Sequence, residues 1–240
     1  MCLQSGAAAV IRIGIADDQE LLREGLALIL DKQPDMTVVG QAGDGVEAIA
    51  LARELHPDVI VMDVRMPRLT GVDATRRIIA EHPGTRILVL TMFDLDEYVY
   101  AALRAGASGF LLKDSPRASI IAAVRSVVTG DVLLAPEVTR RLIANHGRDG
   151  AASTLPHPGI DSLTDRERQV LTEVARGRSN REIATRLHIG EATVKTHVAR
   201  LLAKLGQRDR VHLVVLAYET GIAQPGAQPP TSAPIAGARY

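Results

Sequence analysis

Residues 58–67 read DVIVMDVRMP, and this stretch is the clearest indication of the fold. Four apolar residues, 59–62, lead directly into Asp63, and Pro67 marks a loop a few positions later. A strand that is apolar at every position is typical of a sheet covered on both faces. The carboxylate of Asp63 at the end of such a strand therefore needs partners from elsewhere in the chain.

The surrounding region, residues 11–134, alternates short apolar runs with longer segments of helical period. This alternation predicts a five-stranded parallel, doubly wound α/β sheet with helices on both faces, and ligands of such sheets bind at the carboxyl ends of the strands. The predicted strands are 10–16, 36–42, 58–63, 86–91 and 109–112, and the predicted helices are 21–30, 46–55, 72–82, 96–106 and 117–128.

Polar residues follow four of these strands. Asp17 and Asp18 come after the first strand, Asp63 ends the third, Thr91 ends the fourth, and Lys113 follows the fifth. We expect all five side chains to meet at one edge of the sheet. Three carboxylates at one place repel one another unless a cation lies between them, and a donor set made only of oxygen favours Mg²⁺.

A carboxylate at such a site can act as a nucleophile toward phosphorus. Phosphoryl transfer then requires mainly positioning and neutralising groups, for which Lys113, Thr91 and Mg²⁺ are suitable. A phosphoryl group on Asp63 would add about 1.5 to 2 negative charges and would draw Thr91 and the loop after the fourth strand toward it. The pattern therefore predicts a switch rather than a catalytic cycle.

Two enzymatic alternatives share the same aspartate. GDGVEA at 43–48 fits a G-x-G-x-x-A dinucleotide motif, and Asp63 lies 20 residues beyond Gly43, where such a fold places a ribose-binding acid. This alternative leaves Asp17, Asp18 and the other strand-end residues unexplained. A phosphatase acting through an aspartyl phosphate is the second alternative, but it expects an acid two residues after the nucleophile, where Arg65 stands.

Residues 11–134 resemble the receiver domain of two-component response regulators, which has a flavodoxin-like fold. The resemblance rests on the DD pair at 17–18, on VMDVRMP followed by Gly71, on LT at 90–91 and on AGASGFLLKD at 105–114. Asp114 departs from the pattern, because many receivers have proline there.

The resemblance assigns a role to each matching residue. It implies that Asp63 is the phosphoacceptor, that Lys113 contacts the phosphoryl group, and that Thr91 and Phe110 are the switch residues. The implied Mg²⁺ ligands are Asp18 and Asp63 directly, the Arg65 backbone carbonyl, and Asp17 through water.

The remaining chain divides by composition. We expect an extension at 1–10, a linker at 135–161 with a helix at 135–146, a small all-α domain at 162–221 and a disordered Pro- and Ala-rich tail at 222–240. Two T/S-x-x-E capping signatures, at 164–167 and 179–182, open helices of the all-α domain. Residues 162–220 hold 11 Lys and Arg against 7 Asp and Glu, although the whole chain has no net charge. A basic domain favours a nucleic-acid partner.

Within this domain, residues 179–206 contain two short helical runs separated by Gly190, which is the spacing of a helix-turn-helix. One face of the second run is apolar and is expected to pack against the preceding helices. The other surface is small and basic, which suits a helix in the major groove of DNA. The apolar face consists of Val194, Val198, Leu201, Leu202 and Leu205, and the outward residues include Lys195, Thr196, Ala199, Arg200 and Lys204.

Residues 163–206 resemble the LuxR-type DNA-binding domain, and with a receiver ahead of it the chain is similar to the NarL/FixJ family. The resemblance implies groove contacts from Lys195 and Thr196 and phosphate contacts from Arg200 and Lys204. Ala199 occupies a position where several members carry a basic contact, so that contact is expected to be missing. The segment 211–220 resembles the family's dimer helix, with Val211, Val214, Val215 and Tyr218 as the expected dimerisation residues.

These resemblances imply a response regulator and transcription factor, phosphorylated on Asp63 by a sensor histidine kinase. The implied partners are promoter DNA with two-fold symmetric half-sites, a second copy of the chain and RNA polymerase. We expect no enzymatic turnover beyond slow self-phosphorylation and dephosphorylation. The single cysteine, Cys2, excludes an internal disulfide framework, and no apolar run approaches the ~18 residues needed to cross a membrane, so we expect a cytoplasmic protein without membrane contact.

Overall fold

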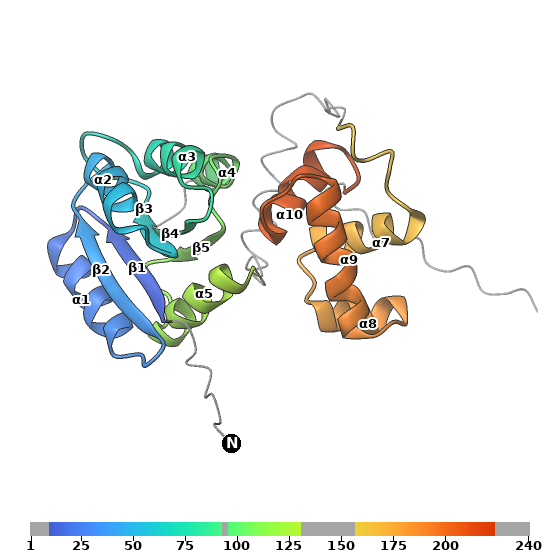
Figure 1. Ribbon diagram of the computed structural model, residues 1–240, viewed down its shortest axis with the longest axis horizontal. Helices are drawn as coiled ribbons and strands as arrows, with labels where there is room; N and C mark the ends of the chain where they lie inside the picture. Colours follow the sequence, from blue (N-terminus) through green and yellow to red (C-terminus); the bar gives the residue numbers. More distant parts are fainter. Residues whose placement is uncertain (1–9, 93–95, 131–156, 224–240) are drawn as a thin grey trace, which may run out of the picture.

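The computed structural model describes residues 10–92, 96–130 and 157–223, which form a sheet region followed by a bundle of helices (Figure 1). The helix expected at 135–146 lies outside the described residues, as do residues 1–9 and the tail beyond Ala223.

The sheet region contains the five predicted strands and the five predicted helices. The strands are all parallel and lie in the order β2-β1-β3-β4-β5. Their bounds are β1 Ile11–Ala16, β2 Met36–Ala42, β3 Val59–Asp63, β4 Arg86–Thr91 and β5 Gly109–Leu112. The helices are α1 Glu20–Asp31, α2 Gly45–Leu55, α3 Gly71–Glu81, α4 Asp96–Arg104 and α5 Arg117–Thr129. The predicted doubly wound α/β fold is confirmed.

Helices cover both faces of this sheet, with α1 and α5 on one side and α2, α3 and α4 on the other (Figure 1). All five residues of β3 are buried as a result. The apolar run before Asp63 follows from this position, because a central strand has no face in contact with water.

The strand order brings the ends of β1 and β3 together, and with them the predicted site residues Asp17 and Asp63. β1 and β3 are neighbours, although β2 separates them in the sequence, and Ala16 pairs with Met62. Asp17 therefore follows its strand directly beside Asp63. The order of the strands reverses between β1 and β3, and the crevice at such a reversal is where open α/β sheets bind ligands.

The C-terminal region is a bundle of four described helices. These are α7 Asp165–Ala175, α8 Asn180–Leu187, α9 Glu191–Lys204 and α10 Arg210–Glu219. Both predicted capping boxes are present, Thr164 with Glu167 on α7 and Ser179 with Glu182 on α8. The predicted apolar face of α9 is confirmed, because Val194, Val198 and Leu201 are buried among the residues of the bundle core.

Helix α10 packs against α7 of its own bundle and also against α4 of the sheet region, so it forms the side of the bundle that meets the sheet region (Figure 1). The Arg208 guanidinium donates to the backbone carbonyls of Thr85, at 2.8 Å, and Gly106, at 3.2 Å. Nearby, the Arg86 guanidinium lies 3.6 Å from the Asp209 carboxylate. At the other end of α10, Glu219 accepts a hydrogen bond of 3.2 Å from the Tyr100 hydroxyl. The two regions therefore meet through specific polar contacts.

Among the described residues, no helix combines the length and apolar character that a membrane crossing requires.

Candidate functional site

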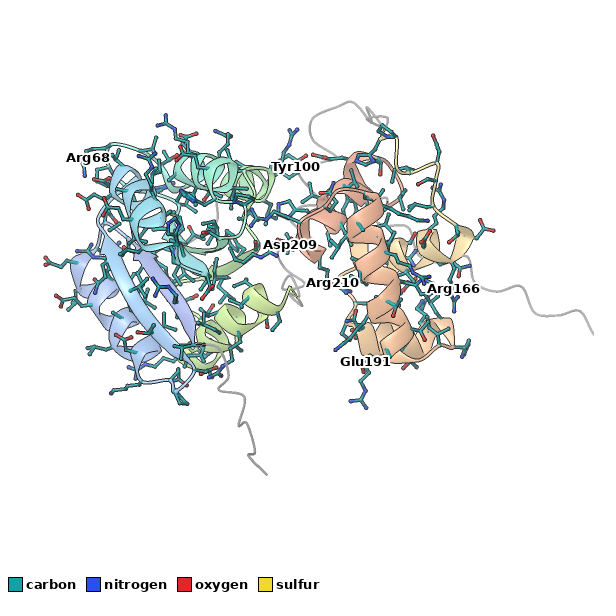
Figure 2. The ribbon with its side chains drawn as sticks, viewed as in Figure 1. Arg68, Tyr100, Arg166, Glu191, Asp209 and Arg210 are labelled. Atoms are coloured by element: carbon teal, nitrogen blue, oxygen red, sulfur yellow. The ribbon has the colours of Figure 1, made fainter. Side chains whose placement is uncertain are left out.

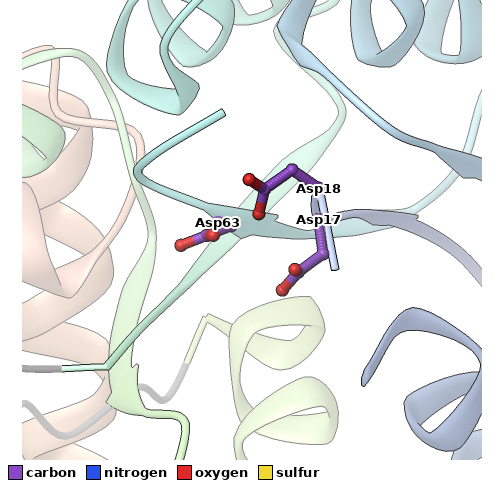
Figure 3. Close-up of side chains that lie close together, drawn as sticks. All are labelled: Asp17, Asp18 and Asp63. Carbon is purple, nitrogen blue, oxygen red and sulfur yellow. The ribbon is translucent and has the colours of Figure 1, made fainter. Parts of the chain in front are cut away.

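Three carboxylates gather where β1 and β3 end (Figure 3). Asp17, Asp18 and Asp63 each offer an oxygen atom, and these atoms lie within 4.8 Å of one another. Asp17 and Asp63 are 2 % and 6 % exposed, whereas Asp18 is exposed to solvent. The cluster is thus buried on one side and open on the other, and its three carboxylates form a candidate metal site.

Lys113 supplies the positive charge on the buried side of this cluster. Its ammonium group lies 2.8 Å from a carboxylate oxygen of Asp63 and 2.8 Å from one of Asp17. Burial alone would lower the pKa of Lys113, but the hydrogen bonds to Asp17 and Asp63 raise that pKa above its ordinary value. The ammonium therefore remains charged and holds two of the three acids together.

At Asp63, unlike Lys113, the effect of burial on the pKa outweighs the effect of the hydrogen bonds. Burial raises the pKa of the Asp63 carboxyl above its ordinary value, and the charge of Asp17 acts in the same direction. Hydrogen bonds from Lys113 and from the Arg65 backbone amide lower that pKa but do not cancel the effect of burial. The negative charge of Asp63 is therefore unfavourable in its present surroundings, and added positive charge at the open side of the cluster would stabilise it.

Thr91 and Phe110 lie on the neighbouring strands. Thr91 ends β4 next to Asp63 on β3, since Asp63 pairs with Leu90, and the backbone carbonyl of Thr91 accepts a hydrogen bond of 2.8 Å from the Lys113 amide. Phe110 is part of the buried core of the sheet region. The turn after Lys113 is closed by a hydrogen bond of 3.0 Å from the Ser115 amide to the Leu112 carbonyl, so Asp114, exposed in this turn, does not prevent a regular path of the chain.

The glycine motif at 43–48 has a different setting from a dinucleotide site. It follows β2, an edge strand, rather than a strand at the reversal of the sheet order. The Asp44 side chain accepts hydrogen bonds from the amides of Val46 and Glu47 and so caps α2. Gly45 has no room for a Cβ, because the carbonyl of Leu69 lies against it. The motif therefore joins α2 to the loop after β3.

All five predicted DNA-contacting residues are exposed on α9, namely Lys195, Thr196, Ala199, Arg200 and Lys204. The Thr196 hydroxyl donates to the Ala192 carbonyl of its own helix, at 3.0 Å. Lys204 differs from the other four in its partner, because its ammonium lies 2.7 Å from the Glu167 carboxylate of α7 although its side chain is 38 % exposed. The sequence contains no local signal for this ion pair, since the two residues lie on different helices.

The Glu167 ion pair predicts a pH dependence of stability in the C-terminal bundle. The hydrogen bond from Lys204 and that from the Thr164 amide lower the pKa of Glu167 from 4.5 to about 2. An acid with a lowered folded-state pKa stabilises the fold above its unfolded-state pKa and loses this contribution as the pH falls. We therefore expect the protection of α7 and α9 amides from hydrogen exchange to decrease between about pH 4.5 and about pH 2.

The matched variant for this prediction is Glu167→Gln, which keeps a residue suited to the capping box but does not titrate. At pH 7 it should be less stable than the wild type by about 1 kcal/mol. At about pH 2, where Glu167 of the wild type is largely protonated, this difference in stability between the variant and the wild type should largely disappear. An equal difference at both pH values would show that Glu167 does not carry the effect.

The four predicted dimerisation residues of α10 are buried within the single chain. Val211, Val214 and Val215 belong to the hydrophobic core, and the Tyr218 hydroxyl donates to the Ala175 carbonyl of α7, at 3.1 Å. The bundle is also tied to α10 by Arg210, whose guanidinium donates to the Asn180 side chain at 2.8 Å (Figure 2). A role of these residues in dimerisation stays a prediction, and it would require that α10 change its partners.

The comparisons with known proteins agree with this arrangement. Residues 13–125 match the family described as the response regulator receiver domain, and residues 161–217 match bacterial regulatory proteins of the luxR family. The transcriptional regulatory protein YxjL of Bacillus subtilis is 43% identical over 214 residues, which cover 89% of this chain and 98% of that protein. The transcriptional regulatory protein LiaR of the same organism is 41% identical over 209 residues, 87% of this chain and 97% of that protein.

Among solved structures, a two-component response regulator of the LuxR family from Aurantimonas sp. SI85-9A1 is 32% identical, with a TM-score of 0.54 over 58% of this chain and 100% of that one. A receiver sheet joined to a helix-turn-helix bundle defines a transcriptional response regulator. The chain belongs to the NarL/FixJ family of these regulators, with a receiver domain and a LuxR-type DNA-binding domain. This family membership favours the regulator over the two enzymatic alternatives.

Proposed function

We propose that Asp63 is the phosphoacceptor of this chain and that its phosphorylation by a sensor histidine kinase controls the binding of promoter DNA. The observation that carries the proposal is the position of the Lys113 ammonium, 2.8 Å from Asp63 and 2.8 Å from Asp17. A fixed cation beside a carboxylate nucleophile is suited to the equatorial oxygens of a phosphoryl group.

In the transfer step, a carboxylate oxygen of Asp63 attacks phosphorus, and the bond from phosphorus to the donor's leaving atom breaks. Lys113 is placed to neutralise the phosphoryl oxygens. Thr91, on the neighbouring strand, offers a hydroxyl to the new acceptor oxygens, which is how we propose that the loop after β4 responds.

The cluster also fits a magnesium ion. Its donors are oxygens only, and three of them lie within 4.8 Å of one another. We propose that Asp18 and Asp63 hold Mg²⁺ directly, with Asp17 through water and with the Arg65 carbonyl. When bound, Mg²⁺ supplies positive charge to the phosphoryl oxygens and offsets the repulsion of the three carboxylates.

The contact between α4 and α10 provides a path from this site to the DNA-binding half. α4 begins a few residues after Thr91, and its C-terminal part holds Glu219 of α10 through Tyr100 and through Arg104, whose guanidinium lies 3.3 Å from the same carboxylate. We infer that movement of the Thr91 loop shifts α4 and weakens its hold on α10. The result is a population shift toward chains in which α10 is free to pair with a second copy.

The DNA-binding half acts through the exposed surface of α9. Lys195 and Thr196 would reach base edges in the major groove, while Arg200 would contact phosphate. A dimer would place two such helices on two-fold symmetric half-sites, and bound RNA polymerase is the expected target of the regulation. This function belongs to the cytoplasm, where promoter DNA is found.

Intact mass spectrometry tests the phosphoacceptor proposal. The wild-type chain, incubated with Mg²⁺ and a small phosphodonor, should gain a single phosphoryl group. The absence of an adduct at any Mg²⁺ concentration would overturn the proposal.

Lys195→Ala should weaken DNA binding about tenfold, because the variant loses a cation at the groove while the apolar face of α9 is unchanged. The measurement is fluorescence anisotropy with a DNA fragment that the wild-type protein selects from a random pool. Lys32→Ala is the matched control, since Lys32 is an exposed lysine of the receiver domain. Equal affinities of Lys195→Ala and the control would contradict the assignment of α9 to the groove.

A further inference from the structure

The loop that follows the phosphoacceptor, residues 64–70, is held closely at its end nearest the sheet. The Gly71 amide donates to the Val64 carbonyl, at 2.9 Å, and Val64 itself is buried. A side chain at Gly71 would collide with the Asp63 carbonyl, so the start of α3 lies directly against the end of β3. The two ends of the loop are thus fixed to each other.

The middle of the loop is held from the opposite side by α2. Arg68 has a left-handed backbone conformation, with φ of 60°, which is unfavourable for a residue with a Cβ. Its guanidinium donates to the Asp44 carboxylate and also lies 2.8 Å from the Glu47 carboxylate. Arg68 lies beside α2 in the structure (Figure 2). One arginine therefore joins the loop to two acids at the N-terminus of α2.

We call the contacts of the Arg68 guanidinium with Asp44 and Glu47 the fork. Both acids also cap α2 by themselves, so the fork is not needed for capping. Asp44 already accepts the amides of Val46 and Glu47, and Glu47 accepts the Gly43 amide at 2.8 Å. Helix α2 is therefore capped without Arg68. What the guanidinium adds is a connection to the loop, and Gly45 permits the close approach because the Leu69 carbonyl occupies the place of a Cβ.

The connection matters for the site because Arg65 lies in the same loop. The Arg65 amide hydrogen-bonds to the Asp63 carboxylate, and its carbonyl is the proposed backbone ligand of the cation. Only Met66 and Pro67 separate Arg65 from Arg68; Met66 is buried, and the proline ring restricts the backbone. A restraint on Arg68 therefore restrains the Arg65 peptide.

We propose that the fork from Arg68 to Asp44 and Glu47 is a positioning device that holds the Arg65 peptide in the orientation required for the divalent cation. The inference rests on the proposed function, because it assumes that the backbone carbonyl of Arg65 binds the cation held by Asp63. Groups that orient a metal ligand typically contribute ten- to a hundredfold to metal affinity, and for an exposed ion pair we expect the lower end of this range, about tenfold.

The test measures binding of Mg²⁺ alone, by calorimetry on the full chain, in the wild type and in a set of variants. Arg68→Asn removes the fork and keeps a residue that tolerates the left-handed conformation. Asp44→Asn keeps a good cap for α2 and removes the charged partner. Arg53→Asn is the matched control, because Arg53 is a similarly exposed arginine of α2 that pairs with Glu81 at 2.9 Å.

The expected result is about tenfold weaker Mg²⁺ binding in Arg68→Asn and in Asp44→Asn, with wild-type affinity in the control. The double variant should bind no more weakly than either single one, since both remove the same interaction. Arg68→Lys, which keeps one charge, should recover part of the affinity. At saturating Mg²⁺, Arg68→Asn should still form the phosphoryl adduct.

Wild-type Mg²⁺ affinity in Arg68→Asn would overturn the inference and leave the proposed function intact. The same holds if the variant has a lower unfolding temperature but unchanged affinity, because that would be a purely structural role. Absence of both Mg²⁺ binding and a phosphoryl adduct in the wild type would instead overturn the proposed function, and the inference with it.

Discussion

Asp63→Asn is expected to abolish phosphoryl transfer to the chain completely. Asparagine has nearly the same shape as aspartate, but its amide is not a nucleophile toward phosphorus, and Asp17 and Asp18 follow a different strand. The fold should not suffer, because burial and the neighbouring Asp17 already make the charge of Asp63 unfavourable, as its raised pKa shows. Intact mass after incubation with Mg²⁺ and a small phosphodonor is the measurement.

Two further substitutions sharpen this experiment. Asp114→Asn is the matched control, since Asp114 is an exposed acid beside Lys113 that is not part of the carboxylate cluster, and it should be phosphorylated like the wild type. Asp18→Asn should lower the rate at limiting Mg²⁺ and recover at high Mg²⁺. An undiminished adduct in Asp63→Asn would place the phosphoacceptor elsewhere in the chain.

Arg208→Ala is expected to increase DNA binding by the unphosphorylated chain about tenfold, equivalent to about 1.4 kcal/mol. The substitution removes the hydrogen bonds from Arg208 to the carbonyls of Thr85 and Gly106, which join the DNA-binding half to the receiver domain. Loss of a hydrogen-bonding partner of this kind costs about 1 to 3 kcal/mol. This cost destabilises the state in which the two halves are in contact, so the population shifts toward the state in which they are separate. Anisotropy with a specific DNA fragment and sedimentation velocity measure binding and dimerisation.

Arg86→Ala tests the same contact from the receiver side. Arg86 lies 3.6 Å from the Asp209 carboxylate and donates to the Arg208 carbonyl, at 3.2 Å, so its loss leaves the surface of the DNA-binding half unchanged. It should shift DNA binding in the same direction as Arg208→Ala. Arg125→Ala is the control, because Arg125 pairs with Asp35 within the receiver domain, at 2.7 Å. If both interface variants bind DNA like the wild type, the contact does not restrain α10.

Sequence patterns predicted most of the fold and the residues that gather at the candidate site. Continuous apolar runs identified the five strands, because a doubly covered strand tolerates few polar residues. The polar residues at the strand ends then identified Asp17, Asp18, Asp63, Thr91 and Lys113, because carboxyl ends of parallel strands share one edge. The capping boxes of α7 and α8 were equally visible, since a cap is read from residues three positions apart.

Partners across the chain were not predictable in the same way. The ion pairs of Lys204 with Glu167 and of Arg68 with Asp44 join different elements, and no spacing rule relates their positions. The sequence does contain a signal for the capping role of Asp209, since a carboxylate one residue before an apolar helix is typical of a cap. Its side chain accepts the amides of Val211 and His212. Its position near Arg86 of the receiver domain had no such signal.

The sequence by itself determined the two domain types, the order of their elements and the polar residues that end the strands of the sheet, because these depend on local periodicity and on which side chains end a strand. Only the tertiary structure decided that Lys113 joins Asp63 to Asp17, that the glycine motif at 43–48 supports the loop after Asp63, and that α10 is covered by α4. Each of these depends on the strand order and on the packing of distant segments, and such contacts are specified by the complete fold rather than by neighbouring residues.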